Sequence, residues 1–128
     1  EYNGFEINPN NRKVINILRE KMLELNRLRA RDPENELLER GVYPDIIIHK
    51  RQTSENLLII ESKKSTNTNQ SEIDFDFEKL LRFTSDNNDN QLNYKYGLFI
   101  NFIVANKPGY ELTWFKNGIK INEDELWK

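Results

Sequence analysis

The sequence predicts a single α/β domain, bordering on α+β, in which one mixed β-sheet is flanked by helices. Three observations predict this fold class. The chain has 128 residues, which is the length of one ordinary domain. Two β-branched runs, residues 42–49 and 57–63, have the apolar continuity of buried strands. Segments with helical spacing of apolar residues stand before and after these two runs.

The first part of the chain is predicted to pass from a strand into a helical segment. Residues 1–11 hold two aromatic residues, then Gly, Pro and an Asn cluster, which indicates the end of a strand followed by a loop. Apolar residues then recur at steps of three and four, at Val14, Ile15, Leu18, Met22, Leu25 and Leu28. We therefore predict a helical segment over residues 12–40, interrupted at Asp32-Pro33.

The two β-branched runs are predicted to form an antiparallel hairpin, because only seven polar residues join them. A helix is predicted over residues 74–84, where Phe75, Phe77, Leu80, Leu81 and Phe83 follow helical spacing. Further strands are predicted over residues 96–104 and 110–116. Asn117-Gly118 then marks a tight turn.

Composition excludes several kinds of site. The chain has no cysteine, which excludes a disulfide scaffold, a Cys-based zinc site and thiol catalysis. Its one histidine, His49, makes a poly-His metal site and a Ser-His-Asp triad improbable, and it is expected to be structural rather than catalytic. The formal net charge of −2 gives no overall basic field, although a local basic rim would suffice for nucleic acid.

No membrane partner is expected from the sequence. The most apolar stretch, residues 97–105, is interrupted by Asn101 and is far shorter than a membrane span. The first thirty residues contain no apolar run that resembles a signal-peptide core. We therefore expect a cytoplasmic protein. Because the chain begins with Glu1, we also expect a trimmed fragment.

Charged residues stand at the ends of the two predicted hairpin strands. Asp45 lies at the start of the first strand, and Glu61 and Lys63 lie on one face at the end of the second, so the hairpin brings them side by side. Burying such charges is costly unless they are paired or hold a metal. The residues alone leave two interpretations open: a Mg²⁺ site formed by Asp45, Glu61 and the backbone carbonyl of Ser62, or an ordinary strand-end salt bridge.

A metal at this position would supply phosphoryl-transfer chemistry, because it polarises a phosphoryl oxygen and activates water. Three roles are open to Lys63 beside it. The lysine could orient the attacking water, act as a base with a lowered pKa, or stabilise the transition state. The residues that could carry this chemistry are Asp45, Glu61 and Lys63.

The segment Tyr43-Pro44-Asp45, followed after fifteen residues by Glu61-Ser62-Lys63, resembles the signature of the PD-(D/E)xK nuclease superfamily. The resemblance covers residues 41–105, including the stretches DFEKLLRFT and YGLFI. It implies a restriction-endonuclease-like core and a Mg²⁺-dependent nuclease, with Mn²⁺ as a substitute, that acts on DNA. It assigns Mg²⁺ binding to Asp45 and Glu61 and the attacking water to Lys63. It also implies an N-terminal helix, which we expect this chain to lack.

Other residues are predicted to contact the nucleic-acid backbone. They are Lys50, Arg51, Lys64 and Lys79, each with a solvated side chain as the alternative. Tyr94, Tyr96 and Trp114 would stack on bases or belong to a core or interface. Two further functions stay open: a catalytically silent nucleic-acid- or protein-binding module with a nuclease-like fold, and a structural domain whose charges form a salt bridge. The C-terminal strands also offer a surface for a homodimer.

Overall fold

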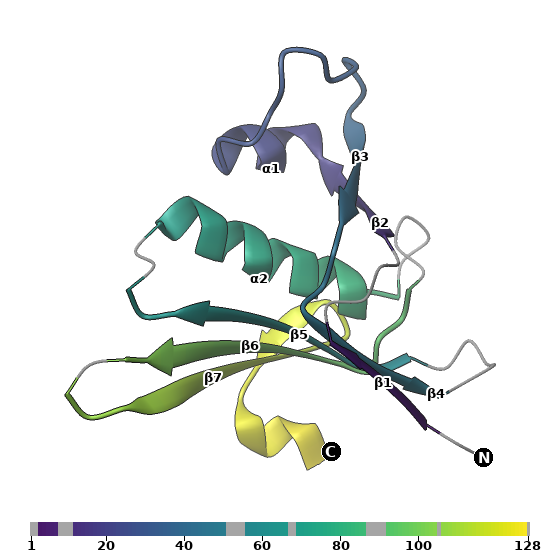
Figure 1. Ribbon diagram of the computed structural model, residues 1–128. Helices are drawn as coiled ribbons and strands as arrows, with labels where there is room; N and C mark the ends of the chain where they lie inside the picture. Colours follow the sequence, from purple (N-terminus) through teal and green to yellow (C-terminus); the bar gives the residue numbers. More distant parts are fainter. Residues whose placement is uncertain are drawn as a thin grey trace.

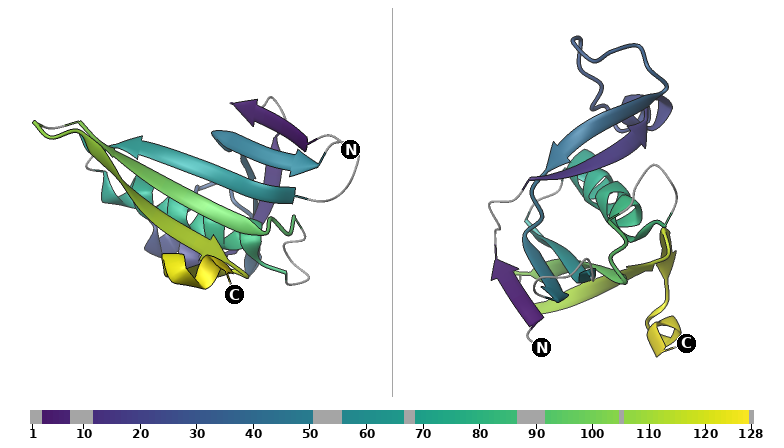
Figure 2. Two further views of the ribbon diagram at one scale, coloured as in Figure 1. Left: turned by 90° about the horizontal axis from the view of Figure 1, so that it is seen from below. Right: turned by 90° about the vertical axis from the view of Figure 1, so that its right-hand side faces the viewer.

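A computed structural model describes residues 3–7, 12–50, 56–66, 69–86, 92–104 and 106–127, without the side chains of residues 3–7 and of Lys50. Six strands form one sheet in the order β1 (Asn3–Ile7), β4 (Ile46–Lys50), β5 (Asn56–Lys64), β6 (Tyr96–Ile103), β7 (Gly109–Lys116) and β8 (Ile119–Ile121). The β5–β6 pair is parallel and the other pairs are antiparallel, so the predicted mixed sheet is confirmed. Figure 2 shows these strands from below.

One long helix, α2 (Gln70–Thr84), lies across one face of the sheet (Figure 1). The predicted helix is confirmed, and it begins four residues earlier than predicted because Asn69 caps it. The side chain of Asn69 accepts a hydrogen bond from the main-chain nitrogen of Glu72 at 3.2 Å. A 3-10 helix, η1 (Glu123–Trp127), lies on the opposite side of the sheet (Figures 1 and 2).

The predicted helical segment over residues 12–40 is wrong. The structure has instead a two-stranded antiparallel sheet of β2 (Lys13–Leu18) and β3 (Leu37–Val42), with the short helix α1 (Arg19–Glu24) between them. Buried and less buried residues alternate along both strands, as at Ile15 and Ile17, because one face packs on the molecule. The β-branched residues of this stretch favour a strand over a helix. We call residues 13–42 the lobe.

The helix α2 lies between the lobe and the sheet, so both of its sides are covered (Figure 2). On the sheet side, the ring of Phe77 meets Phe99 and Phe115 edge-on, with centroids 4.9 and 5.4 Å apart. On the lobe side, Ile15 and Ile17 of β2 belong to the same buried cluster as Leu80 and Phe83 of α2. The remaining buried members of this cluster are Met22, Leu38, Val42, Ile47, Ile59, Tyr94, Phe99 and Phe115. The lobe therefore shares the core of the sheet.

Two connections between neighbouring strands follow the predictions. The β4–β5 hairpin is confirmed, with Ile46 opposite Ile60. The tight turn at Asn117-Gly118 is confirmed too, with φ of 55° and 77°, the combination that a two-residue hairpin turn requires. Within the described part of the chain, neither α1 nor α2 is long and apolar enough to cross a membrane.

Candidate functional site

Asp45 precedes β4 and is fixed to the neighbouring strand β5. Its carboxylate oxygen Oδ2 accepts a hydrogen bond from the main-chain nitrogen of Ser62 at 2.9 Å and one from the Ser62 hydroxyl at 3.3 Å. Pro44, directly before it, is fully buried. The hairpin thus places Asp45 beside Ser62, the residue that follows Glu61 on β5. The sequence predicts this proximity of Asp45 and Glu61.

Glu61 is a buried carboxyl that faces α2. Its side chain lies beneath the helix, where Oε1 is 3.4 Å from the Nζ of Lys79, and the residue is 3% exposed. The other oxygen, Oε2, has no hydrogen-bond partner among the described residues. Burial raises the pKa of Glu61 to about 8; Lys79 opposes this rise, whereas the charges of Asp76 and Asp45 add to it. Without a further cation, Glu61 is therefore mostly protonated at neutral pH.

Lys63 lies on the same face of β5 as Glu61, as strand alternation predicts. Its Nζ is 3.0 Å from Oδ2 of Asp76 and 3.9 Å from Oε1 of Glu72, both on α2. Partial burial acts to lower the pKa of Lys63, but the hydrogen bond and charge of Asp76 outweigh it, so the pKa is raised. Lys63 is therefore a charged ammonium, and the role of a base with a lowered pKa does not fit this arrangement.

Besides Glu72, two more residues of α2, Asp76 and Lys79, belong to the charged cluster, and sequence reasoning assigned none of the three to it. Asp76 is buried and bridges the two lysines, with its Oδ1 2.9 Å from the Nζ of Lys79. Lys79 is predicted as a backbone contact for nucleic acid, but the structure places its ammonium inward, between Asp76 and Glu61. The available signal is the spacing of Glu72, Asp76, Lys79 and Phe83, which follows one helical face into the core.

The charged cluster carries more negative than positive groups. Two ammonium groups lie among four carboxyl groups; the members are Lys63, Lys79, Asp45, Glu61, Glu72 and Asp76. Two positive charges would balance the ionised cluster, which is the charge of one divalent cation. The donor set therefore suits such an ion at the Asp45–Glu61 end.

The ligands available for a cation are few. Within the described ranges, no three His, Cys, Asp or Glu side chains come together as a metal-binding group. A cation at Asp45 and Glu61 would need a main-chain oxygen and waters as well, which suits Mg²⁺. The N–H and C=O of one strand residue point to the same edge of the strand, and the Ser62 nitrogen binds Asp45, so the Ser62 carbonyl lies on the edge of β5 that faces β4.

Of the other predicted backbone contacts, the structure describes the side chain of Lys64 alone. Lys64 is exposed at the end of β5. Arg51 and the side chain of Lys50 lie outside the described residues. His49 is half-buried within β4.

The three predicted stacking aromatics are buried or half-buried. Tyr94 is buried, and its ring meets Phe83 edge-on at 6.1 Å. Tyr96 is half-buried, and its hydroxyl donates to the main-chain oxygen of Leu126 at 3.3 Å. Trp114 is half-buried on β7. Tyr94 therefore belongs to the core, which is one of the two roles predicted for it.

Comparison with known proteins does not assign the chain to a family. The resemblance to PD-(D/E)xK nucleases therefore stays a prediction, carried by the sequence motif of Asp45, Glu61 and Lys63. No family model, no curated protein and no solved structure matches the chain.

Proposed function

We propose that the chain is a metal-dependent nuclease that hydrolyses phosphodiester bonds of DNA. The observation that supports it most is the buried carboxyl of Glu61, which keeps Oε2 without a hydrogen-bond partner among the described residues, close to Asp45. Such a group is costly to bury in its charged form unless a cation compensates it. Asp45, Glu61 and the carbonyl of Ser62 would hold Mg²⁺ or Mn²⁺ at this point.

Lys63 and Asp76 have different roles in the proposed hydrolysis. When bound, the cation polarises a phosphoryl oxygen and lowers the pKa of water. Lys63, kept charged by Asp76, orients the attacking water and a phosphate oxygen. The water oxygen bonds to phosphorus, the bond from phosphorus to the leaving sugar oxygen breaks, the water proton passes to solvent and the leaving oxygen takes up a proton. Asp76 is a positioning residue, because it acts through the two lysines.

A cleavage assay tests this proposal. Wild type, Asp45→Asn and Lys63→Ala are incubated with labelled single-stranded and duplex DNA, in Mg²⁺ or in EDTA. We expect cleavage only with metal, and a loss of at least about 100-fold in both variants, the effect typical of removing a charge-stabilising or proton-handling group. Lys120→Ala, an exposed lysine on β8, serves as the matched control and should cleave like wild type. Metal-dependent cleavage that survives Asp45→Asn would contradict the assignment.

One observation favours the alternative of a catalytically silent domain. Both lysines of the charged cluster already have carboxyl partners in the chain itself, as a purely structural ion-pair network would. In that case neither single-stranded nor duplex DNA is cleaved in the presence of Mg²⁺. Asp45→Asn then changes the free energy of unfolding alone, through the lost hydrogen bonds to Ser62.

A further inference from the structure

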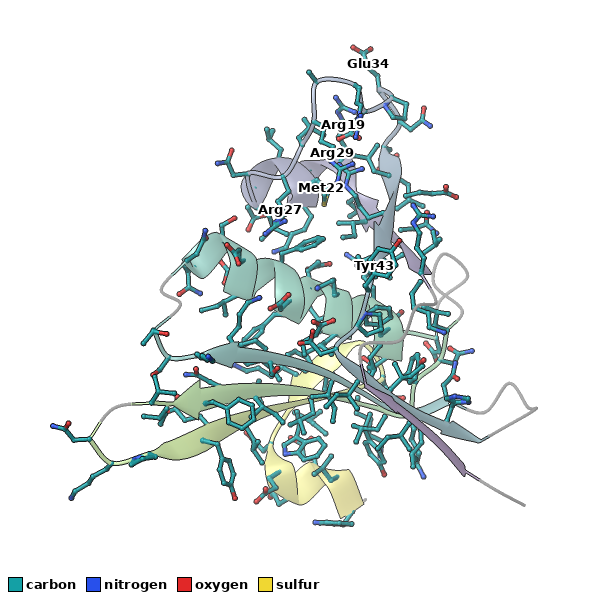
Figure 3. All side chains as sticks on the ribbon, in the orientation of Figure 1. Arg19, Met22, Arg27, Arg29, Glu34 and Tyr43 are labelled. Carbon is teal, nitrogen blue, oxygen red and sulfur yellow. The ribbon has the colours of Figure 1, made fainter. Side chains whose placement is uncertain are left out.

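A polar cleft of about 820 Å³ separates the lobe from the N-terminal half of α2. Its walls include Arg27 and Arg29, which follow α1, Tyr43 at the end of the lobe, and Glu72, Phe75 and Lys79 of α2. Figure 3 shows Arg27 on the side of the lobe that faces α2, and Tyr43 where the chain leaves the lobe. We infer that this cleft binds a single nucleic-acid strand and leads it to the Asp45–Glu61 site. The inference rests on the proposed function for the identity of the polymer.

Two arginines give the cleft its affinity for anions. Neither Arg27 nor Arg29 forms an ion pair with any carboxylate in the described part of the chain, and the Nε of Arg27 has no hydrogen-bond partner there. The Arg27 guanidinium lies 4.3 Å from the centre of the Phe75 ring, which fixes its direction. Guanidinium groups placed in this way suit the oxygens of phosphate.

The neighbouring arginine shows the contrast. Arg40 also lines the cleft, but its two terminal nitrogens bind the carboxylate of Asp32 at 3.0 and 2.5 Å. Arg40 is therefore engaged within the lobe, whereas no carboxylate of the described residues forms an ion pair with Arg27 or Arg29. The acidic residue of the lining, Glu72, faces Lys63 at 3.9 Å.

Tyr43 connects the cleft to the charged cluster. Its side chain is exposed, with 60% of the residue accessible, and it stands two residues before Asp45. Lys79 makes a second connection, because it lines the cleft and also reaches Glu61 at 3.4 Å. A strand whose phosphates lie on the arginines would thus pass Tyr43 on its way to the two carboxyl groups.

The chemistry of the cleft favours a single strand over a duplex. An exposed aromatic ring binds nucleic acid by stacking on a base, and the base must be unpaired to offer its face. The volume of about 820 Å³ is that of a small-ligand pocket, sufficient for a short stretch of strand. A duplex exposes base edges and grooves rather than base faces.

Fluorescence anisotropy in EDTA tests the inference, with labelled oligo-dT as the single strand and a duplex of the same length. The double variant Arg27→Gln/Arg29→Gln should bind oligo-dT at least about tenfold more weakly. The slope of log K against log salt concentration should become shallower by about 1.4, since each lost phosphate contact on a single strand contributes about 0.7. Arg31→Gln is the matched control, because this exposed arginine lies on the same loop but outside the cleft lining.

Tyr43→Ala should weaken binding of oligo-dT by about fivefold to a hundredfold, the range for one lost base stack, and Tyr43→Phe should restore it. The double variant Arg27→Lys/Arg29→Lys keeps both charges but not the guanidinium groups, so it should lose less affinity than the Gln double variant and keep the salt slope of wild type. Three results would each overturn the inference: no binding of oligo-dT by wild type at low salt, equal loss in Arg31→Gln, or tighter binding of the duplex.

The inference and the proposed function fail in different ways. Binding is measured without metal, and Asp45→Asn should bind oligo-dT like wild type while it fails to cleave. If wild type binds oligo-dT but does not cleave DNA in Mg²⁺, the nuclease proposal is contradicted, whereas the inference that the cleft binds a single strand is supported. If variants of Arg27, Arg29 and Tyr43 still cleave a single strand in the presence of metal, the inference about the cleft is contradicted and the nuclease proposal is not.

Discussion

Replacing Glu61 by glutamine should stabilise the metal-free protein at pH 8. Burial raises the pKa of Glu61 from 4.5 to about 8. A carboxyl with a raised pKa in the folded state favours folding while it is protonated, and this contribution is lost as the pH rises. The loss begins near 4.5, where the unfolded carboxyl ionises, and levels off near 8, where the folded carboxyl follows.

The size of the effect follows from the two pKa values. Each pKa unit corresponds to about 1.4 kcal/mol, so the interval from 4.5 to 8 amounts to on the order of 5 kcal/mol of unfolding free energy. Glutamine has the shape of the protonated glutamate and no charge to bury. The variant should therefore lack this loss, and Lys79 keeps Asp76 as a partner at 2.9 Å.

Urea unfolding at pH 5 and pH 8 in EDTA, followed by tryptophan fluorescence, measures the effect. Glu78→Gln is the matched control: Glu78 is also a buried glutamate, but it binds the guanidinium of Arg82 at 2.6 and 2.7 Å. Its loss should destabilise the protein by about 1 to 3 kcal/mol, because Arg82 is left without that partner. The account of Glu61 is refuted if Glu61→Gln destabilises at pH 8 as Glu78→Gln does.

Three further predictions concern the fold. The side chain of Arg40 and then the main-chain N–H of Arg29 hold the pKa of Asp32 down at about 2, so the stability that this carboxylate contributes is present above about pH 4 and lost toward pH 2. Acid melts of wild type should show this loss, and those of Asp32→Asn should lack it. Phe83→Ala should lower the free energy of unfolding in urea by about 3 to 5 kcal/mol, because the ring is fully buried against Tyr94. Asn117→Val should lower the melting temperature, at a cost of about 1 to 2 kcal/mol, because φ is 55° there, whereas Asn117→Gly should not.

The sequence predicts the sheet better than the lobe, for a physical reason. The runs that became β4, β5 and β6 are apolar on consecutive positions, and such strands are recognisable without their partners. Residues 13–18 carry apolar side chains at spacings that fit a helix as well as a strand. What decides for the strand is pairing with residues 37–42, where Leu38 and Val42 are buried, and such long-range pairing is not readable from local spacing.

The site was predictable only in part. Asp45, Glu61 and Lys63 stand out because charges interrupt apolar strands, and the hairpin register brings the strand ends together. Their partners on α2 could not be assigned, since the angle at which a helix crosses a sheet depends on tertiary packing. The position of Asp76 over Lys63 thus appears only in the folded chain. The cleft likewise depends on the lobe, and the helical segment predicted for most of the lobe was wrong.

The most direct test of the central claim is thermal melting at pH 7 with and without Mg²⁺, at matched ionic strength. A ligand that binds only the folded protein adds about 1.4 kcal/mol at ten times its Kd, which corresponds to roughly 5 °C for a domain of this size. Wild type should show this rise, as should Asp124→Asn, which removes an exposed carboxylate on η1. Asp45→Asn should not. An unchanged wild-type melting temperature, or an equal rise in Asp45→Asn, would contradict a cation site at Asp45 and Glu61.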